Sequence, residues 1–232
     1  MSSMIYTPHP APWQLQGNGY IQLFKASPEW IWENGFIPNH LLKRYIPHSQ
    51  ALAMWVDYHS SDAGPYRELL FIPGRFRFDE NGFRGNRYVI TKIYVSTMAS
   101  VENGRQNWGI PKELADFDIQ SLGPRSERIT VRQDDAFIAQ ADFQYARLKL
   151  PVTTRLLPPS LGSVAQYRGD DLVITAPQAR GRSHLASLKN AQYDPALFPN
   201  LADEAVKQSL CLATRDFTMQ FPVPRVFVPN AD

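Results

Sequence analysis

A single lysine, Lys112, follows a short run of residues that could keep its amine away from water. Pro111 stiffens the chain directly before it and lacks a backbone donor, while Trp108 and Ile110 are large and apolar. An apolar surrounding favours the neutral form of an amine, and a neutral lysine amine attacks carbonyl carbon. An ordinary exposed lysine in a turn fits the same composition. The run 101–113 therefore marks a candidate nucleophile.

The spacing of two motifs resembles that of the acetoacetate decarboxylase family. Gly104-Arg105, followed by Pro111-Lys112, is similar to the Gly-Arg-Glu and Tyr-Pro-Lys-Lys stretch of that family, in which the lysine after the proline forms the substrate imine. That lysine falls on Lys112. Upstream, the run 64–68 is similar to the family's Tyr-x-Glu motif, and its active-site glutamate falls on Glu68. The resemblance extends over residues 51–228.

The resemblance implies roles for four further side chains around the lysine. Glu68 would position water or shuttle a proton, and Arg105 would hold a substrate carboxylate through a bidentate contact. Tyr66 and Trp108 would line the substrate site. A structural ion pair between Arg105 and Glu102 is an equally good interpretation, and Glu68 also fits a solvated position on a strand. We expect no cofactor and no metal.

The chain departs from the family pattern at three places. Glu113 stands where the family has a second lysine, an arginine expected near the first strand is replaced by Asn18 or Gly19, and another pocket glutamate falls on Ala53. Without a neighbouring cation, burial must supply nearly all of the lowering of the Lys112 pKa that keeps the amine neutral. Because side chains alternate along an extended chain, we expect Glu113 to point away from Lys112.

The implied function is that of a carbon–carbon lyase, a decarboxylase that acts on a β-keto acid of the acetoacetate type. A lysine imine serves other outcomes equally, so an aldolase or dehydratase acting on a larger oxo acid is the first alternative. The second is a non-catalytic β-barrel protein that binds a small molecule. The family also implies a homo-oligomer.

Other catalytic motifs find little support in the sequence. The five histidines have no paired spacing typical of metal ligands, and no serine-hydrolase elbow or phosphate-binding loop occurs. The one cysteine, Cys211, excludes an intramolecular disulfide, and its leucine neighbours predict a buried thiol.

The elements that must position these residues are mostly strands. β-branched and aromatic residues alternate with polar ones, and turn signals such as Asn81-Gly82 separate the runs. The sequence predicts a mainly β fold with minor α content, an antiparallel barrel-like arrangement or stacked sheets. The expected strands are 20–25, 52–58, 68–72, 88–97, 129–133, 137–150, 172–175 and 217–223.

Only a few short helices are expected. Pro38 opens a helical pattern that ends before Pro47. A second helix is predicted over 201–212, because Asp203 and Glu204 stand in its first turn and apolar residues recur along one side.

Composition and the N-terminal region complete the prediction. Prolines at 8, 10 and 12 predict an extended arm over residues 1–19 that lies across the body or a neighbouring subunit, and residues 1–232 are expected to form one domain. The net charge of +2 is spread along the chain, which disfavours nucleic acid as a partner. No apolar run approaches the ~18 residues of a membrane span, and no signal peptide is evident, so a cytoplasmic location is the default.

Overall fold

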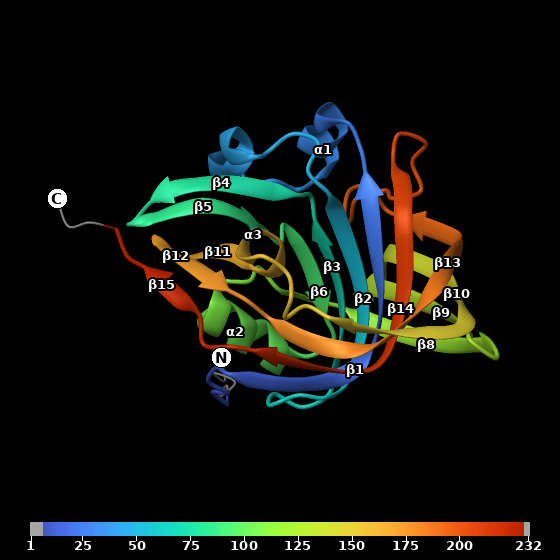
Figure 1. Ribbon diagram of the computed structural model, residues 1–232. Helices are drawn as coiled ribbons and strands as arrows, with labels where there is room; N and C mark the ends of the chain where they lie inside the picture. The colour runs from blue at the N-terminus through green and yellow to red at the C-terminus, as the bar shows by residue number, and fades with distance from the viewer. Residues whose placement is uncertain (1–6, 230–232) are drawn as a thin grey trace.

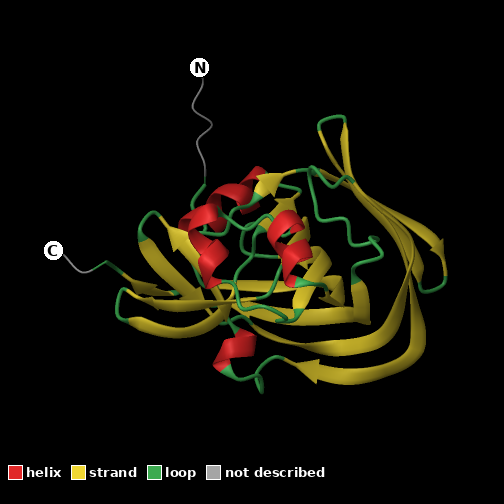
Figure 2. Ribbon diagram, turned by 90° about the horizontal axis from the view of Figure 1, so that it is seen from above, coloured by secondary structure: helices red, strands yellow, loops and turns green. Residues whose placement is uncertain are grey.

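The computed structural model describes residues 7–229 and consists mainly of two β-sheets (Figure 1). Strands make up 57% of the described residues and helices 13%, which confirms the predicted mainly β class. The larger sheet curls into a nearly closed, barrel-like wall (Figure 2). Its ten strands, in order across it, are β7 (Glu113–Leu114), β6 (Lys92–Val95), β3 (Tyr66–Ile72), β2 (Ala51–Ser60), β1 (Trp13–Lys25), β14 (Lys207–Phe221), β13 (Gln178–Tyr193), β10 (Ala136–Thr153), β9 (Ser126–Gln133) and β8 (Asp116–Gly123).

The smaller sheet and four short helices complete the described part of the chain. The five strands of this sheet are β15 (Arg225–Phe227), β12 (Asp171–Thr175), β11 (Val164–Arg168), β5 (Phe83–Tyr88) and β4 (Arg75–Glu80). The helices are α1 (Pro28–Asn34), the 3₁₀ helix η1 (Asn39–Arg44), α2 (Met98–Trp108) and α3 (Pro159–Gly162). Pairing is antiparallel except between β6 and β7 and between β5 and β11.

Strand β2 buries side chains on both faces of the large sheet and so divides the core in two. Ala53 and Trp55 belong to the cluster inside the barrel, where Trp55 packs edge-on against Phe143. Val56 and Tyr58 belong to a second cluster, which also contains residues of α2. The second cluster is the environment in which Lys112 is placed.

Most of the predicted strands are present, several of them longer than expected. The strand predicted at 88–97 is divided, because β5 ends at Tyr88 and the chain joins the large sheet only at β6. Between them Thr91 donates its hydroxyl to the carbonyl of Gly35 and its backbone N–H to the carbonyl of Phe71. The predicted buried thiol is confirmed, since Cys211 is buried inside the barrel.

The helix predicted over 201–212 is wrong. Asp203 instead closes a tight turn, accepting the backbone N–H of Ala205 on its carboxylate and that of Val206 on its carbonyl. From Lys207 the chain becomes β14, which fills the place between β1 and β13. Pairing with strands on both sides overrides the local helical pattern.

The extended arm is shorter than predicted and has a partner within the chain. Residues 1–6 of the predicted arm lie outside the described residues, and β1 begins already at Trp13. The intervening segment lies on α2: His9 donates its N–H to Asn103 and accepts the side-chain amide of Asn107 on its carbonyl. The arm therefore gives no support to a homo-oligomer, which stays a prediction.

Helix α2 has end signals that fix both of its boundaries. The Thr97 hydroxyl accepts the N–H of Ser100 at the N-terminus, and Gly109 adopts a left-handed conformation at the C-terminus with φ 66°. The N–H of Gly109 bonds the carbonyl of Arg105, and that of Ile110 bonds the carbonyl of Gly104. The chain then leaves the helix in the direction of Lys112.

We predict that Gly109→Ala destabilises the protein more than Gly169→Ala does. Both glycines have a similar left-handed φ, 66° and 61°, which costs a residue with a Cβ about 1–2 kcal/mol. At Gly109 the added Cβ would also overlap the carbonyl oxygen of Tyr167, whereas nothing lies within 4 Å at Gly169. Urea unfolding should show a further loss of about 1–3 kcal/mol for the first variant. Equal losses in the two variants would show that the contact with Tyr167 is unimportant.

Candidate active site

Lys112 lies buried between helix α2 and the large sheet, with 3% of its surface exposed. It follows the helix by four residues and directly precedes β7. Its stem passes against Gly104, where an added Cβ would lie 2.6 Å from Cδ of the lysine. Glycine at this position of α2 therefore makes room for the lysine side chain.

The amine of Lys112 has three polar neighbours. Its Nζ lies 3.1 Å from Oε2 of Glu68 and donates a hydrogen bond of 2.9 Å to the hydroxyl of Ser100. The hydroxyl of Tyr66 lies 3.5 Å away, and the amine lies 4.8 Å from the centre of the Tyr66 ring. The amine is thus held by a carboxylate, two hydroxyls and an aromatic face, all on buried residues.

Glu68 comes from β3 and is 5% exposed. Its second oxygen, Oε1, accepts the hydroxyl of Tyr58 at 3.4 Å. Tyr58 lies directly opposite Tyr66 in the β2–β3 pair, and the two rings are 4.7 Å apart. Both carboxylate oxygens therefore have a partner, which a buried carboxylate requires.

Burial raises the pKa of the Tyr58 and Tyr66 hydroxyls well above 10.0, and the negative charge of Glu68 raises both further. The two phenols are therefore neutral at all ordinary pH values. A neutral phenol can donate a hydrogen bond to Glu68 or to a bound substrate.

The structure brings together three of the five residues that the sequence predicted for the site: Lys112, Glu68 and Tyr66. Sequence reasoning missed Ser100 and Tyr58. The signal for Tyr58 was available, because antiparallel pairing of two predicted strands places it across from Tyr66. Ser100 could be found only once α2 was recognised, since Ser100 and Gly104 are four residues apart on one helical face.

Arg105 and Trp108 are placed elsewhere on α2. Arg105 is exposed, and within residues 7–229 it takes part in no ion pair, either with Glu102 or with Lys112's neighbours. Trp108 is buried in the second cluster, where it packs edge-on against Trp13 and donates its indole N–H to the carbonyl of Pro222. It contributes to the apolar surroundings through packing and not through a polar contact with the lysine.

The positions that depart from the family motif also have their own partners. Glu113 accepts the amine of Lys92 at 2.7 Å, so its carboxylate is engaged away from Lys112, in the direction the alternation of side chains predicts. Ala53 is fully buried inside the barrel. The amide of Asn18 is hydrogen-bonded to the ring of His59 near the surface.

No three metal-ligating side chains come together to hold an ion anywhere in the described part of the chain. Over the same residues, no helix is both long and apolar enough to span a membrane.

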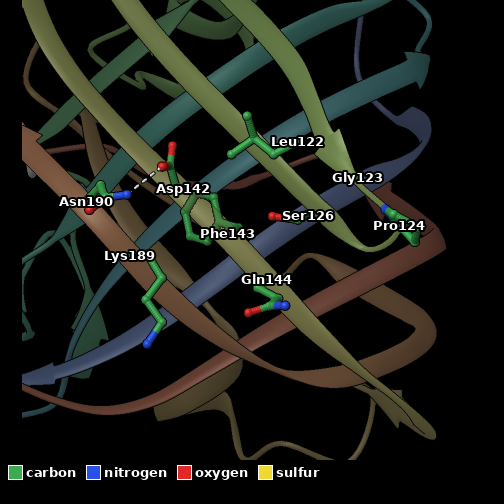
Figure 3. Close-up of a pocket in the computed structure, with 9 residues that line it drawn as sticks. All are labelled: Leu122, Gly123, Pro124, Ser126, Asp142, Phe143, Gln144, Lys189 and Asn190. Atoms are coloured by element: carbon green, nitrogen blue, oxygen red, sulfur yellow. Dashed lines mark hydrogen bonds between the residues drawn. The ribbon is translucent and has the colours of Figure 1, made fainter.

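A cavity of about 370 Å³ is lined by residues of β8, β9, β10 and β13 (Figure 3), and none of the residues around Lys112 belongs to its lining. Its lining includes Asp142, whose carboxylate accepts the amide of Asn190 at 2.9 Å and the guanidinium of Arg128 at 2.6 Å. The hydrogen bonds from Arg128 lower the pKa of Asp142. The carboxylate of Asp142, the one acidic group of the lining, is therefore already engaged by Arg128 and Asn190.

We predict that Tyr58→Phe changes the dependence of stability on alkaline pH. The unfolded chain releases the phenol proton near pH 10.0, whereas the folded protein retains it because the pKa of Tyr58 is raised. The stability due to the neutral phenol is complete below that value and falls as the pH rises above it. The Tyr58→Phe variant has no phenol to titrate, so its stability should lack this part of the decrease above pH 10.

Urea unfolding at intervals between about pH 8 and pH 11 provides the measurement. The wild-type protein should be the more stable at pH 8, because the variant lacks the hydrogen bond to Glu68, and the difference should narrow above pH 10. A difference in stability between the two proteins that stays constant over the whole pH range would contradict the raised pKa of Tyr58.

Comparison with known proteins assigns the chain to a family. The family model for acetoacetate decarboxylase matches residues 35–168, which include Glu68, Ser100 and Lys112. Among curated protein sequences, none matches the chain.

Solved structures share the fold over nearly the whole chain. An acetoacetate decarboxylase from Legionella pneumophila matches with a TM-score of 0.64 and 16% identity, covering 97% of this chain and 92% of that one. An acetoacetate decarboxylase-like enzyme from Sphingomonas wittichii RW1 matches with a TM-score of 0.66 and 10% identity over 99% of both chains. The enduracididine biosynthesis enzyme MppR, complexed with the condensation product of pyruvate and imidazole 4-carboxaldehyde, matches with a TM-score of 0.62 and 13% identity, covering 96% of this chain and 91% of that one. Matched over more than half of its length by the family model, the chain belongs to the acetoacetate decarboxylase family.

Proposed function

We propose that the protein is a carbon–carbon lyase that decarboxylates a β-keto acid through a Schiff base on Lys112. The observation that carries the proposal is the buried amine of Lys112, held 3.1 Å from the carboxylate of Glu68. Membership of the acetoacetate decarboxylase family supports the same assignment.

Formation of the Schiff base requires two protons to leave the lysine nitrogen. The first passes from the ammonium to Glu68, which frees the electron pair that attacks the ketone carbon of the substrate. The carbonyl oxygen takes this proton as the C–N bond forms. The second proton follows by the same carboxylate, the oxygen leaves as water, and a protonated imine remains on Lys112.

The protonated imine then accepts the electrons of the bond that breaks. The bond to the carboxylate carbon is cleaved, carbon dioxide leaves, and the electron pair moves toward nitrogen to give an enamine. Glu68 then takes up a proton from solvent and delivers it to the enamine carbon, which supplies the one proton that decarboxylation of a carboxylate consumes. Water hydrolyses the resulting imine, which releases a ketone and restores the Lys112 ammonium.

The remaining neighbours hold these groups in position. Ser100 fixes the amine on the side of α2, and Tyr66 approaches it from β3. Tyr58 donates to the oxygen of Glu68 that does not face the lysine. The proposal gives no role to Arg105, because its side chain is exposed on the outside of α2.

An aldol-type condensation is the second candidate. It uses the same imine, and it is favoured by the likeness of the fold to that of MppR, which was captured with a condensation product of pyruvate. Incubation with acetoacetate, followed by assay of carbon dioxide, is to be compared with incubation with pyruvate and an aldehyde, followed by assay of the condensation product. Imine formation without either product would favour the third possibility, a binding protein without catalysis.

We predict that Lys112→Ala abolishes trapping of a β-keto acid by borohydride. Reduction of the imine should add the mass of the ligand to the peptide that contains Lys112, and mass spectrometry detects it. Lys92→Gln is the matched control, since Lys92 is also mostly buried and paired with a carboxylate, that of Glu113. The control should be trapped like the wild-type protein; undiminished trapping in a folded Lys112→Ala variant would refute the proposed chemistry.

We predict that Gly104→Ala lowers turnover without unfolding the protein. The added methyl group would contact the stem of Lys112 and shift its amine relative to Glu68. A shift of about 1 Å in a reacting group can lower the rate about 100-fold. Alanine itself is favoured over glycine within a helix by about 1 kcal/mol, so the melting temperature should change little. Gly162→Ala in α3 places a methyl group against Leu157 and should leave the rate unchanged. Equal rates in both variants would show that the position of the lysine stem is not critical.

A further inference from the structure

Another cavity, of about 640 Å³, is lined by residues 147–152 of β10, 180–184 of β13 and 215–218 of β14. We call it the basic pocket because its lining contains five cationic side chains and one acidic one: Arg147, Lys149, Arg180, Arg182, Arg215 and Asp216. The whole chain carries a net charge of only +2. Positive charge is therefore concentrated in this pocket, which contains none of the residues that surround Lys112.

Strand pairing places two like charges opposite one another in the basic pocket, because Arg182 of β13 is the direct partner of Arg215 on β14. Like charges directly opposite in an antiparallel pair are destabilising. The arrangement costs stability in the free protein, and an anion bound between the strands would relieve that cost.

The protein itself neutralises little of this charge. Arg215 pairs with Glu127 at 3.1 Å, and Arg180 donates to the hydroxyl of Thr218 at 3.1 Å. Among the ion pairs formed within residues 7–229, none includes Arg147, Lys149 or Arg182. These three side chains are thus left to bind a ligand.

We propose that the basic pocket binds a small ligand through a chain of phosphate groups. Guanidinium groups match phosphate oxygens in bidentate pairs, and cations on three adjacent strands fit several linked anionic groups better than one. The volume is that of a site for a small molecule. The lining offers no phenylalanine, tyrosine or tryptophan on which bases could stack, which disfavours a single-stranded nucleic acid.

Titration calorimetry with inorganic tripolyphosphate tests the proposal on the wild-type protein. Saturable binding at one site per chain is expected, and it should weaken when sodium chloride is raised from about 50 to about 500 mM because salt screens the charges. No binding at millimolar tripolyphosphate would overturn the proposal. Tight binding of a long polyanion that tripolyphosphate fails to displace would also overturn it.

The double variant Lys149→Gln, Arg182→Gln should bind tripolyphosphate at least about tenfold more weakly, because two charge-assisted contacts are lost. The matched control is Lys43→Gln, Arg77→Gln, which removes two exposed cations from η1 and β4 and changes the net charge equally. The control should bind like the wild-type protein. Equal affinity in the two double variants would refute the assignment of the pocket.

Asp216→Asn gives a test in the opposite direction. It removes the one carboxylate of the lining, and asparagine tolerates the left-handed backbone that Asp216 adopts, with φ 50°. Tripolyphosphate should then bind several-fold more tightly, a gain that misfolding cannot produce. Unchanged or weaker binding would count against the pocket. Imine trapping at Lys112 should be unaffected in all these variants, which separates this proposal from the proposed function.

Discussion

The carboxylate of Glu68 and the amine of Lys112 form an ion pair from which water is almost wholly excluded. Taking two charges out of water costs several kcal/mol per ion, and the attraction between them offsets that cost only where the geometry is good and the remaining polar atoms are satisfied. Ser100, Tyr66 and Tyr58 supply those further contacts. Such a pair is a poor means of stabilising a fold, and its retention fits a chemical role in which the proton moves from one partner to the other.

The surrounding elements are arranged around this pair. The β2–β3 hairpin provides Tyr58, Tyr66 and Glu68 on one face, while its other face fills the interior of the barrel. Helix α2 provides Ser100 and the space at Gly104. The segment before β1 bonds to Asn103 and Asn107 of α2, which ties the helix to the beginning of the large sheet's β1.

Much of this arrangement could be predicted from the sequence, because strand patterns and the motifs around Glu68 and Lys112 are local. Helix α2 could not be found from its hydrophobic pattern, since its buried residues include Ser100, Asn103 and Gly104 beside only two large apolar ones. Part of the helix packs against the stem of Lys112 and the proline-rich segment 7–12, which leaves no apolar stripe to detect. Thr97 and Gly109 carried the end signals and are the evidence that sequence reasoning could have used.

The failures at β14 and the basic pocket have a different cause, which is the non-local pairing of strands. The run 201–212 has a helical pattern. In the structure its last residues belong to β14, whose alternate side chains Cys211 and Ala213 point into the barrel. The pocket likewise has no linear motif, because Arg182 and Arg215 meet only through the register of β13 and β14. Basic residues that are far apart in the sequence are brought together in the basic pocket by strand pairing.

The central claim is that the amine of Lys112 exchanges its pairing with Glu68 for a covalent bond to substrate. A crystal structure of the protein after borohydride reduction in the presence of a β-keto acid tests it most directly. We expect continuous electron density from Nζ of Lys112 to a ligand carbon, with the ligand lying between Glu68, Tyr66 and Ser100. An intact Lys112–Glu68 pair, with the ligand attached to another lysine or absent, would contradict it.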